Sequence, residues 1–180
     1  MLIFPAFIHS NNDVTNGDFV TNCPQKSQIQ GCQKLSAMAL GEKIFEEAGK
    51  ITSFKVIKVH PVEGVTSEVT FRSEVRGIGR FPSGKNIASG TMTKYPHGII
   101  DAAWQGTLMT EKGEEFMWWS HEKAKVLEGG KIRGLNTVTG FTNSQNLSWM
   151  NSLIIIVDLA ASVLSDEFCA AAYEWSVTNG

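Results

Sequence analysis

Hydrophobic and polar residues alternate with a period of two through most of the chain. The alternation is clearest in VTSEVTFRSEVR, residues 65–76, where odd-numbered residues fall on one face of a strand and even-numbered residues on the other. The preceding segment, residues 50–59, is rich in β-branched residues and stops before Pro61, and Gly64 offers a turn. We therefore expect these two segments to form a hairpin.

Seven further segments have the composition of strands. They are residues 43–48, 86–95, 99–110, 114–127, 131–141, 153–159 and 168–175. Turns that contain glycine separate several of them, at 96–98, 111–113 and 128–130. Short turns join antiparallel neighbours, and roughly seven to nine strands in one domain make a sandwich or a barrel. We expect an all-β, closed antiparallel barrel of about eight strands, because closure leaves no edge strand. Helical pieces are expected only at 143–150 and 159–164.

The beginning of the chain differs from the rest in composition and in hydrophobic patterning. Residues 11–30 read NNDVTNGDFVTNCPQKSQIQ, which is polar and without periodicity, and such a segment is typical of loop or disorder. The expected organisation is a flexible or loosely attached extension over residues 1–40 and a barrel domain over residues 41–180. Met38 stands where regular patterning begins, so it is an alternative start of the native protein, with the preceding residues as an upstream extension.

The composition narrows the expected partners and location. A chain of 180 residues with 42% hydrophobic and 19% charged residues suits one soluble domain. The net charge is −2 and there is no basic run, so nucleic acid is not an expected partner. The first ten residues lack the basic start of a signal peptide, and no apolar run approaches the roughly 20 residues of a membrane span. We therefore expect a cytoplasmic protein without membrane insertion.

The cysteines and histidines show no spacing typical of a metal site. Cys23, Cys32 and Cys169 are odd in number and contain no C-x-x-C unit, so we expect free thiols, with a Cys23–Cys32 bridge as the alternative. A zinc site needs three or four converging ligands. The histidines stand far apart, at positions 9, 60, 97 and 121. Neither a metal nor another cofactor is expected.

Potential acid–base residues gather in EEFMWWSHEKAKV, residues 114–126. In a regular strand Trp118 and Glu122 share one face and Trp119 and His121 the other. Trp118 has apolar neighbours on its face and is expected inside the barrel, with Trp119 and His121 outside. The functional alternative is a bulge that turns His121 or Glu122 inward as an acid–base group against a lipid-like ligand. The candidate catalytic residues are Glu74, His121 and Glu122.

Aromatic residues are the candidates for lining the interior. A barrel of about eight strands either packs solid or leaves room for one small ligand, which would be apolar. The candidate ligand-binding residues are Phe71, Trp104, Phe116, Trp118 and Phe141. The adjacent pairs Glu46-Glu47 and Glu114-Glu115 are interpreted as solvated strand ends, because neighbouring strand residues diverge and cannot act as a two-carboxylate pair.

The order of motifs over residues 41–176 resembles a known group of proteins. The motifs are GEKIFEEAGKI (41–51), EVTFRSEVRGIG (68–79), AAWQGTLMTEKGEE (102–115), TVTGFTNSQNLSWMNSLIIIVD (137–158) and AAYEWS (171–176). They resemble uncharacterised small prokaryotic proteins that are similar in fold to allene oxide cyclase, an eight-stranded antiparallel barrel of the lipocalin-like, or calycin-like, set. The resemblance implies the barrel. Allene oxide cyclases convert a fatty-acid epoxide to a cyclopentenone, but none of their functional residues matches this chain by motif, so cyclase activity is not carried over.

These observations leave three hypotheses for function. The first is a barrel that binds a small apolar ligand. The second is a cyclase or isomerase that acts on a lipid-like substrate, with the acid–base candidates named above. The third is a structural homo-oligomer without a ligand. Whether the protein is an enzyme stays open at this stage.

Overall fold

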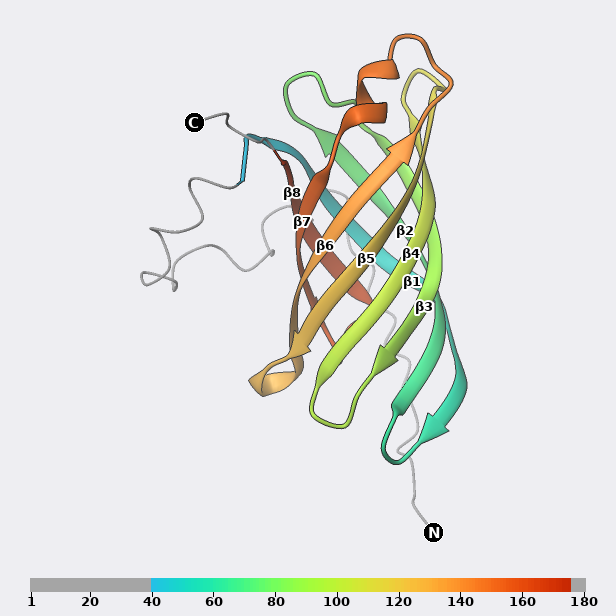
Figure 1. The fold of residues 1–180 in the computed structure, drawn as a ribbon, viewed down its shortest axis with the longest axis vertical. Helices are drawn as coiled ribbons and strands as arrows, with labels where there is room; N and C mark the ends of the chain where they lie inside the picture. Colours follow the sequence, from blue (N-terminus) through green and yellow to red (C-terminus); the bar gives the residue numbers. More distant parts are fainter. Residues whose placement is uncertain (1–39, 176–180) are drawn as a thin grey trace, which may run out of the picture. The chain divides into compact units, whose positions relative to one another are not determined.

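The computed structural model describes residues 40–175, which form a closed antiparallel β-barrel (Figure 1). The elements are β1 (Lys43–His60), β2 (Gly64–Gly77), β3 (Gly84–Lys94), β4 (Ile99–Thr110), β5 (Glu115–Val126), η2 (Glu128–Gly130), β6 (Lys131–Phe141), η3 (Ser148–Ser152), β7 (Ile155–Ser162) and β8 (Glu167–Glu174). Each strand pairs with the next, and β8 pairs with β1. No helix in this part of the chain is long and apolar enough to cross a membrane. The predicted eight-stranded barrel is confirmed, and residues 1–39, including Met38, lie outside the described residues.

The period-two pattern produces the barrel wall as predicted. In β2 the odd positions Ser67, Val69 and Val75 are buried, whereas Glu68 and Arg72 between them are exposed. This is the burial expected of a wall with one face in the interior and one in solvent. The inward face of β2 carries two serines as well as apolar residues, so the interior is not purely apolar.

Two sequence-based boundaries differ from the structure. Residues 43–60 form one strand of 18 residues rather than two, because Gly49 stays paired with Ser73 and Phe168 and its missing side chain leaves room for the Phe168 ring. The predicted helical piece at 159–164 is strand and turn, since β7 stays paired with β6 as far as Ser162. Pairing with a neighbouring strand overrides the local preference of these short apolar segments.

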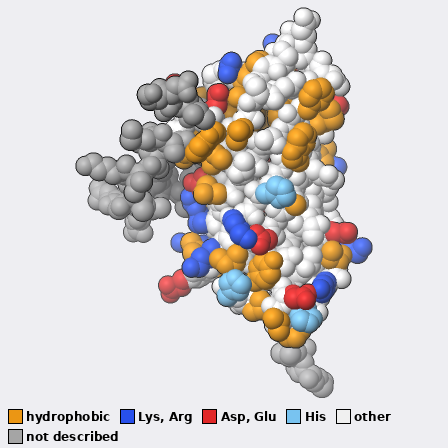
Figure 2. Space-filling view, in the orientation of Figure 1, with side chains coloured by type: hydrophobic (Ala, Val, Ile, Leu, Met, Phe, Trp, Pro, Cys, Tyr) orange, Lys and Arg blue, Asp and Glu red, His pale blue; other side chains and the backbone are white. Residues whose placement is uncertain are grey.

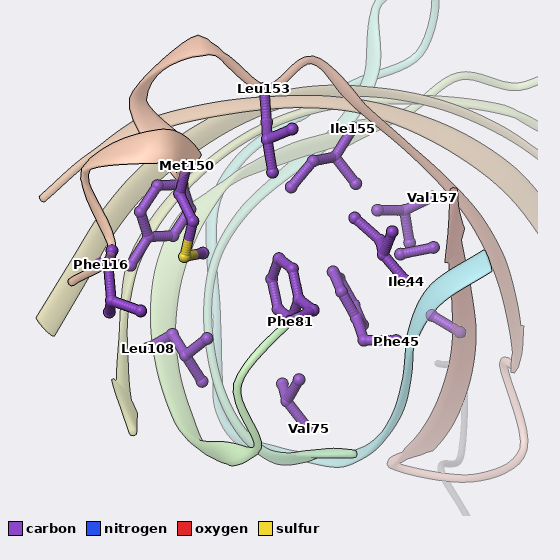
Figure 3. Packing of buried hydrophobic residues seen from close by; sticks show 13 residues of the cluster. Ile44, Phe45, Val75, Phe81, Leu108, Phe116, Met150, Leu153, Ile155 and Val157 are labelled. Carbon is purple, nitrogen blue, oxygen red and sulfur yellow. The ribbon is translucent and has the colours of Figure 1, made fainter. Parts of the chain in front are cut away.

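One end of the barrel is closed by a hydrophobic core. We call it the loop end; it carries the β2–β3, β4–β5 and β6–β7 connections. Met150 of η3 is fully buried there, and Phe81 of the β2–β3 connection packs on Phe45 of β1 with ring centroids 4.8 Å apart. Figure 3 shows these side chains meeting in the middle of the ring of strands, with Phe116 on the side of Met150. All members of the buried core cluster come from this end.

The opposite end, which we call the hairpin end, carries the β1–β2, β3–β4, β5–β6 and β7–β8 turns (Figure 1). Positive φ angles of 89° at Gly64 and 84° at Gly98 close two of these turns. The pairing of β1 with β8 stops at Lys50 and Glu167, whereas β1 and β2 stay paired as far as His60 and Gly64. The β1–β2 hairpin therefore projects beyond β8, and no member of the core cluster closes this end.

Cys169 corrects the expectation of free thiols. It lies in β8 and is disulfide-bonded. Cys23, Cys32 and His9 lie outside the described residues. Rules that use the number and short spacing of cysteines do not detect pairings that depend on the fold.

Candidate ligand-binding site in the barrel interior

The orientation of β5 places Glu122 inside the barrel. The strand pairs with β4 and β6 without a register shift, so its side chains alternate regularly. Phe116, Ser120 and Glu122 are buried on the inward face, whereas Trp119 is 52% exposed on the outer face. His121 is also exposed. Glu122 thus reaches the interior without the bulge considered above, and His121 stays outside.

The other predicted site residues divide between the interior and the outer surface. Phe71, Trp104 and Trp118 occupy inward positions, and Phe116 belongs to the core at the loop end. Phe141 does not line the interior: it is 45% exposed and lies opposite Met117 on the outer face. Inward positions of β6 are even-numbered, so the odd-numbered Phe141 points away. Glu74 likewise lies on the outer face of β2 and is exposed.

Glu122 takes part in a hydrogen-bonded cluster formed by β4, β5 and β6. Its Oε2 atom accepts a hydrogen bond from Trp104 Nε1 at 2.8 Å and one from Asn136 Nδ2 at 3.4 Å. Ser120 Oγ donates to Asn136 Oδ1 at 3.4 Å. Burial raises the pKa of Glu122, and the two hydrogen bonds oppose this effect only in part. The side chain is therefore easier to protonate than an exposed glutamate.

Glu47 forms a second cluster nearer the loop end. Its Oε1 atom accepts hydrogen bonds from Ser73 Oγ and, at 2.9 Å, from Asn86 Nδ2. Asn86 Oδ1 in turn accepts a hydrogen bond from Trp118 Nε1 at 2.9 Å. Burial raises the pKa of Glu47 above its ordinary value, against the effect of the two donors. The interpretation of this residue as part of a solvated strand end is wrong.

Sequence reasoning missed Glu47 although a signal was present. Phe45, Glu47 and Gly49 alternate with polar or small neighbours, and the same period that points Phe45 into the core points Glu47 into the interior. Its neighbour Glu46 faces outward and is bound by Lys43 and Arg76. The two adjacent carboxyl groups thus diverge as expected, but only one of them is solvated.

Aromatic rings line the interior from β2, β4 and β8, and they adjoin the Glu122 cluster through Trp104. Phe71 of β2 makes edge contacts with Trp104 of β4 and with Phe168 of β8, at centroid distances of 5.5 and 5.0 Å. The Trp104 ring lies over Gly90 of β3, where an added Cβ atom would stand 2.6 Å from the ring. Because the ring lies against the wall, it covers the glycine instead of filling the bore. The interior at this level therefore combines aromatic rings with a polar cluster, and the two meet at Trp104.

Several inward-facing side chains at this level are not fully buried. Phe71, Trp104 and Asn136 face inward in a closed wall, yet each retains partial exposure. Among the described residues, Ser67 Oγ is the only fully buried side-chain polar atom without a hydrogen-bond partner. The second carboxyl oxygens of Glu47 and Glu122 also lack a hydrogen-bond partner, and neither is fully buried.

The outer surface of the barrel is less suited to ligand binding than the interior. A depression of about 630 Å³ between β3 and β6 contains His121 and the ion pair of Lys123 with Asp101. It is open to solvent. Figure 2 shows apolar side chains on this face in small, separate groups among charged and polar ones. Within residues 40–175, no three His, Cys, Asp or Glu side chains come together as a metal site would require. The interior is therefore the stronger candidate.

Comparisons with known proteins show the fold. No protein-family model matches the chain, and no curated protein matches it. Among solved structures, a protein of unknown function from Clostridium acetobutylicum matches with a TM-score of 0.65 and 16% identity, covering 75% of this chain and 98% of that one. A beta-barrel like protein from Acinetobacter baumannii matches with a TM-score of 0.63 and 12% identity, and the match covers 75% of this chain and 94% of that one. An enzyme from Penicillium herquei matches with a TM-score of 0.54 and 14% identity, and the match covers 74% of this chain and 92% of that one. At these identities the likeness shows the β-barrel alone, and the resemblance to allene oxide cyclase stays a prediction.

Proposed function

We propose that the protein binds one small, largely apolar molecule inside the barrel, and that this molecule enters at the hairpin end. The observation that carries the proposal is the mixed lining of the interior, where the partly exposed rings of Phe71 and Trp104 adjoin the hydrogen-bonded pair of Glu122 and Asn136. Ligand sites in proteins are mostly apolar with a few polar groups that fix orientation. The packed loop end leaves the hairpin end as the entrance.

Glu122 also supports the second hypothesis, a cyclase or isomerase acting on a lipid-like substrate. A buried carboxyl group with a raised pKa can exchange a proton with a bound molecule. Glu122 is the only one of the three predicted acid–base candidates that faces the interior. Conversion of the bound molecule would distinguish this activity from binding alone. The homo-oligomer and the cytoplasmic location stay predictions.

A matched pair of alanines in β7 tests the proposed site. Ala161 occupies an inward position opposite Ile132 and Phe168, whereas Ala160 is its outward neighbour opposite Arg133 and Cys169. A tryptophan at position 161 would fill the bore between the hairpin end and Glu122. We expect Ala161→Trp to weaken binding of the neutral fluorescent probe N-phenyl-1-naphthylamine roughly tenfold or more, by steric exclusion. Ala160→Trp should bind the probe like the unmodified protein.

Fluorescence titration of the three proteins measures the effect. Circular dichroism should first show that both variants keep the β-sheet spectrum of the unmodified protein. Equal affinity in all three proteins would contradict the proposal, because the probe would then bind outside the barrel. A loss of affinity confined to Ala160→Trp would place binding on the outer wall and would contradict it equally.

A further inference from the structure

The interior carries two carboxyl groups and no basic side chain to pair with either of them. Between the two ends of the barrel, the described inward-facing side chains include the carboxyl groups of Glu47 and Glu122 but no lysine, arginine or histidine. Lys94, the cation at the end of β3, is exposed at the rim. A buried carboxylate is costly without a cation, and the neutral N–H and O–H donors around each group offset only part of this cost. A ligand that brings a positive charge would supply what the interior lacks.

The side chains around Glu122 are arranged so that a positively charged group of a ligand could bind there. Oε2 accepts hydrogen bonds from Trp104 and Asn136, while Oε1 has no partner and is not fully buried. Gly134 leaves room beside Oε1, since a Cβ atom there would stand 3.2 Å from it. Trp104 joins Glu122 to the rings of Phe71 and Phe168, which come from β2 and β8. Aromatic rings attract organic cations through the negative potential of their faces, and more strongly when water is excluded.

We propose that the ligand is an organic cation with an apolar body, either an amine or a quaternary ammonium compound. This inference rests on the ligand-binding function proposed above. The positive group lies between Glu122 Oε1 and the aromatic rings, and the apolar body extends toward the hairpin end. Glu47 lies deeper, where Ser73 and Asn86 hold it next to the core, and it does not contact the positive group.

A series of probes with the same tail tests the charge. Isothermal titration calorimetry on the full chain compares octyltrimethylammonium, octylamine, 1-octanol and octanoate, all well below their aggregation concentrations. We expect the two cations to bind roughly tenfold or more tightly than 1-octanol, and octanoate to bind most weakly. Glu122→Gln keeps the shape of the side chain but removes its charge, and should reduce the preference for cations to about twofold or less. Glu74→Gln, which removes an outward-facing carboxylate of β2, is the matched control and should keep the preference.

The outcomes separate this inference from the function on which it rests. If 1-octanol binds as tightly as octyltrimethylammonium, the charge inference is overturned while ligand binding stands. If no member of the series binds and N-phenyl-1-naphthylamine does not bind either, the proposed function fails. If Glu47→Gln reduces the preference as much as Glu122→Gln does, the assignment of the positive group to Glu122 is overturned. The comparison of ligands on the unmodified protein needs no variant to fold.

Discussion

Met150→Ala is expected to lower the free energy of unfolding by about 2–5 kcal/mol, the range for truncation of a large side chain in a packed core. Met150 has no exposed surface and lies in η3, which supplies part of the core that closes the loop end. Asn151 of the same short helix is hydrogen-bonded to the backbone of Thr142, but Met150 itself contributes only apolar packing. Urea unfolding, followed by tryptophan fluorescence, measures the change.

Met109→Ala is the matched control for this truncation. Met109 is 41% exposed at the loop end of β4 and points outward, so its truncation leaves no cavity and should change the free energy of unfolding by less than about 0.5 kcal/mol. A similar loss in both variants would contradict the packing described for the loop end. So would a Met150→Ala protein as stable as the unmodified one.

The protein should lose stability as the pH rises above about 4.5, because Glu47 and Glu122 have pKa values raised from that ordinary value. Between the ordinary value and the raised pKa the folded protein holds a proton that the unfolded chain has lost. The free energy of unfolding therefore falls as the pH rises, by up to about 1.4 kcal/mol per pH unit for each group. The double variant Glu47→Gln/Glu122→Gln should not show this fall.

Urea unfolding at a series of pH values from 4.5 to 8 tests this prediction. As the pH rises, the free energy of unfolding of the double variant should increase relative to that of the unmodified protein. The free energy of unfolding of Glu74→Gln should change with pH as that of the unmodified protein does. The pKa values of Glu46 and Glu114 are lowered, by hydrogen bonds from Lys43 and Arg76 and from Ser144 and Asn146 respectively. The stability that Glu46 and Glu114 contribute is lost only as the pH falls below 4.5, which is outside the pH range of this experiment. A constant difference between the double variant and the unmodified protein at all pH values would contradict the account.

The fold could be predicted because the wall of the barrel repeats a simple pattern. Residues 65–76 alternate without interruption, and β2 has the predicted faces. The same rule correctly separated Trp118 from Trp119 in β5. Boundaries failed where pairing with a neighbour decides the conformation, as at Gly49 and at 159–164. A single sequence does not contain the register of a neighbouring strand.

The polar side of the interior was harder to predict. Asn86 and Asn136 are disfavoured in strands and have no apolar character, so neither was considered for the interior. Alternation along β3 and β6 points them inward, but their partners Glu47 and Glu122 lie on other strands, and only the register reveals these pairs. Phe141 shows the opposite error, since an aromatic residue was assigned to the interior for its type while its position in the alternation points it outward.

The most direct test of the central claim is the NMR signal of the Trp104 indole N–H group during a titration with N-phenyl-1-naphthylamine. The chain has five tryptophans, and single Trp→Phe variants assign their indole signals. Trp104 donates to Glu122 inside the barrel, whereas Trp119 is half exposed on the outer wall. We expect the Trp104 signal to shift and saturate with the probe while that of Trp119 stays in place. A shift of Trp119 with an unchanged Trp104 would show that the interior beside Glu122 is not the binding site.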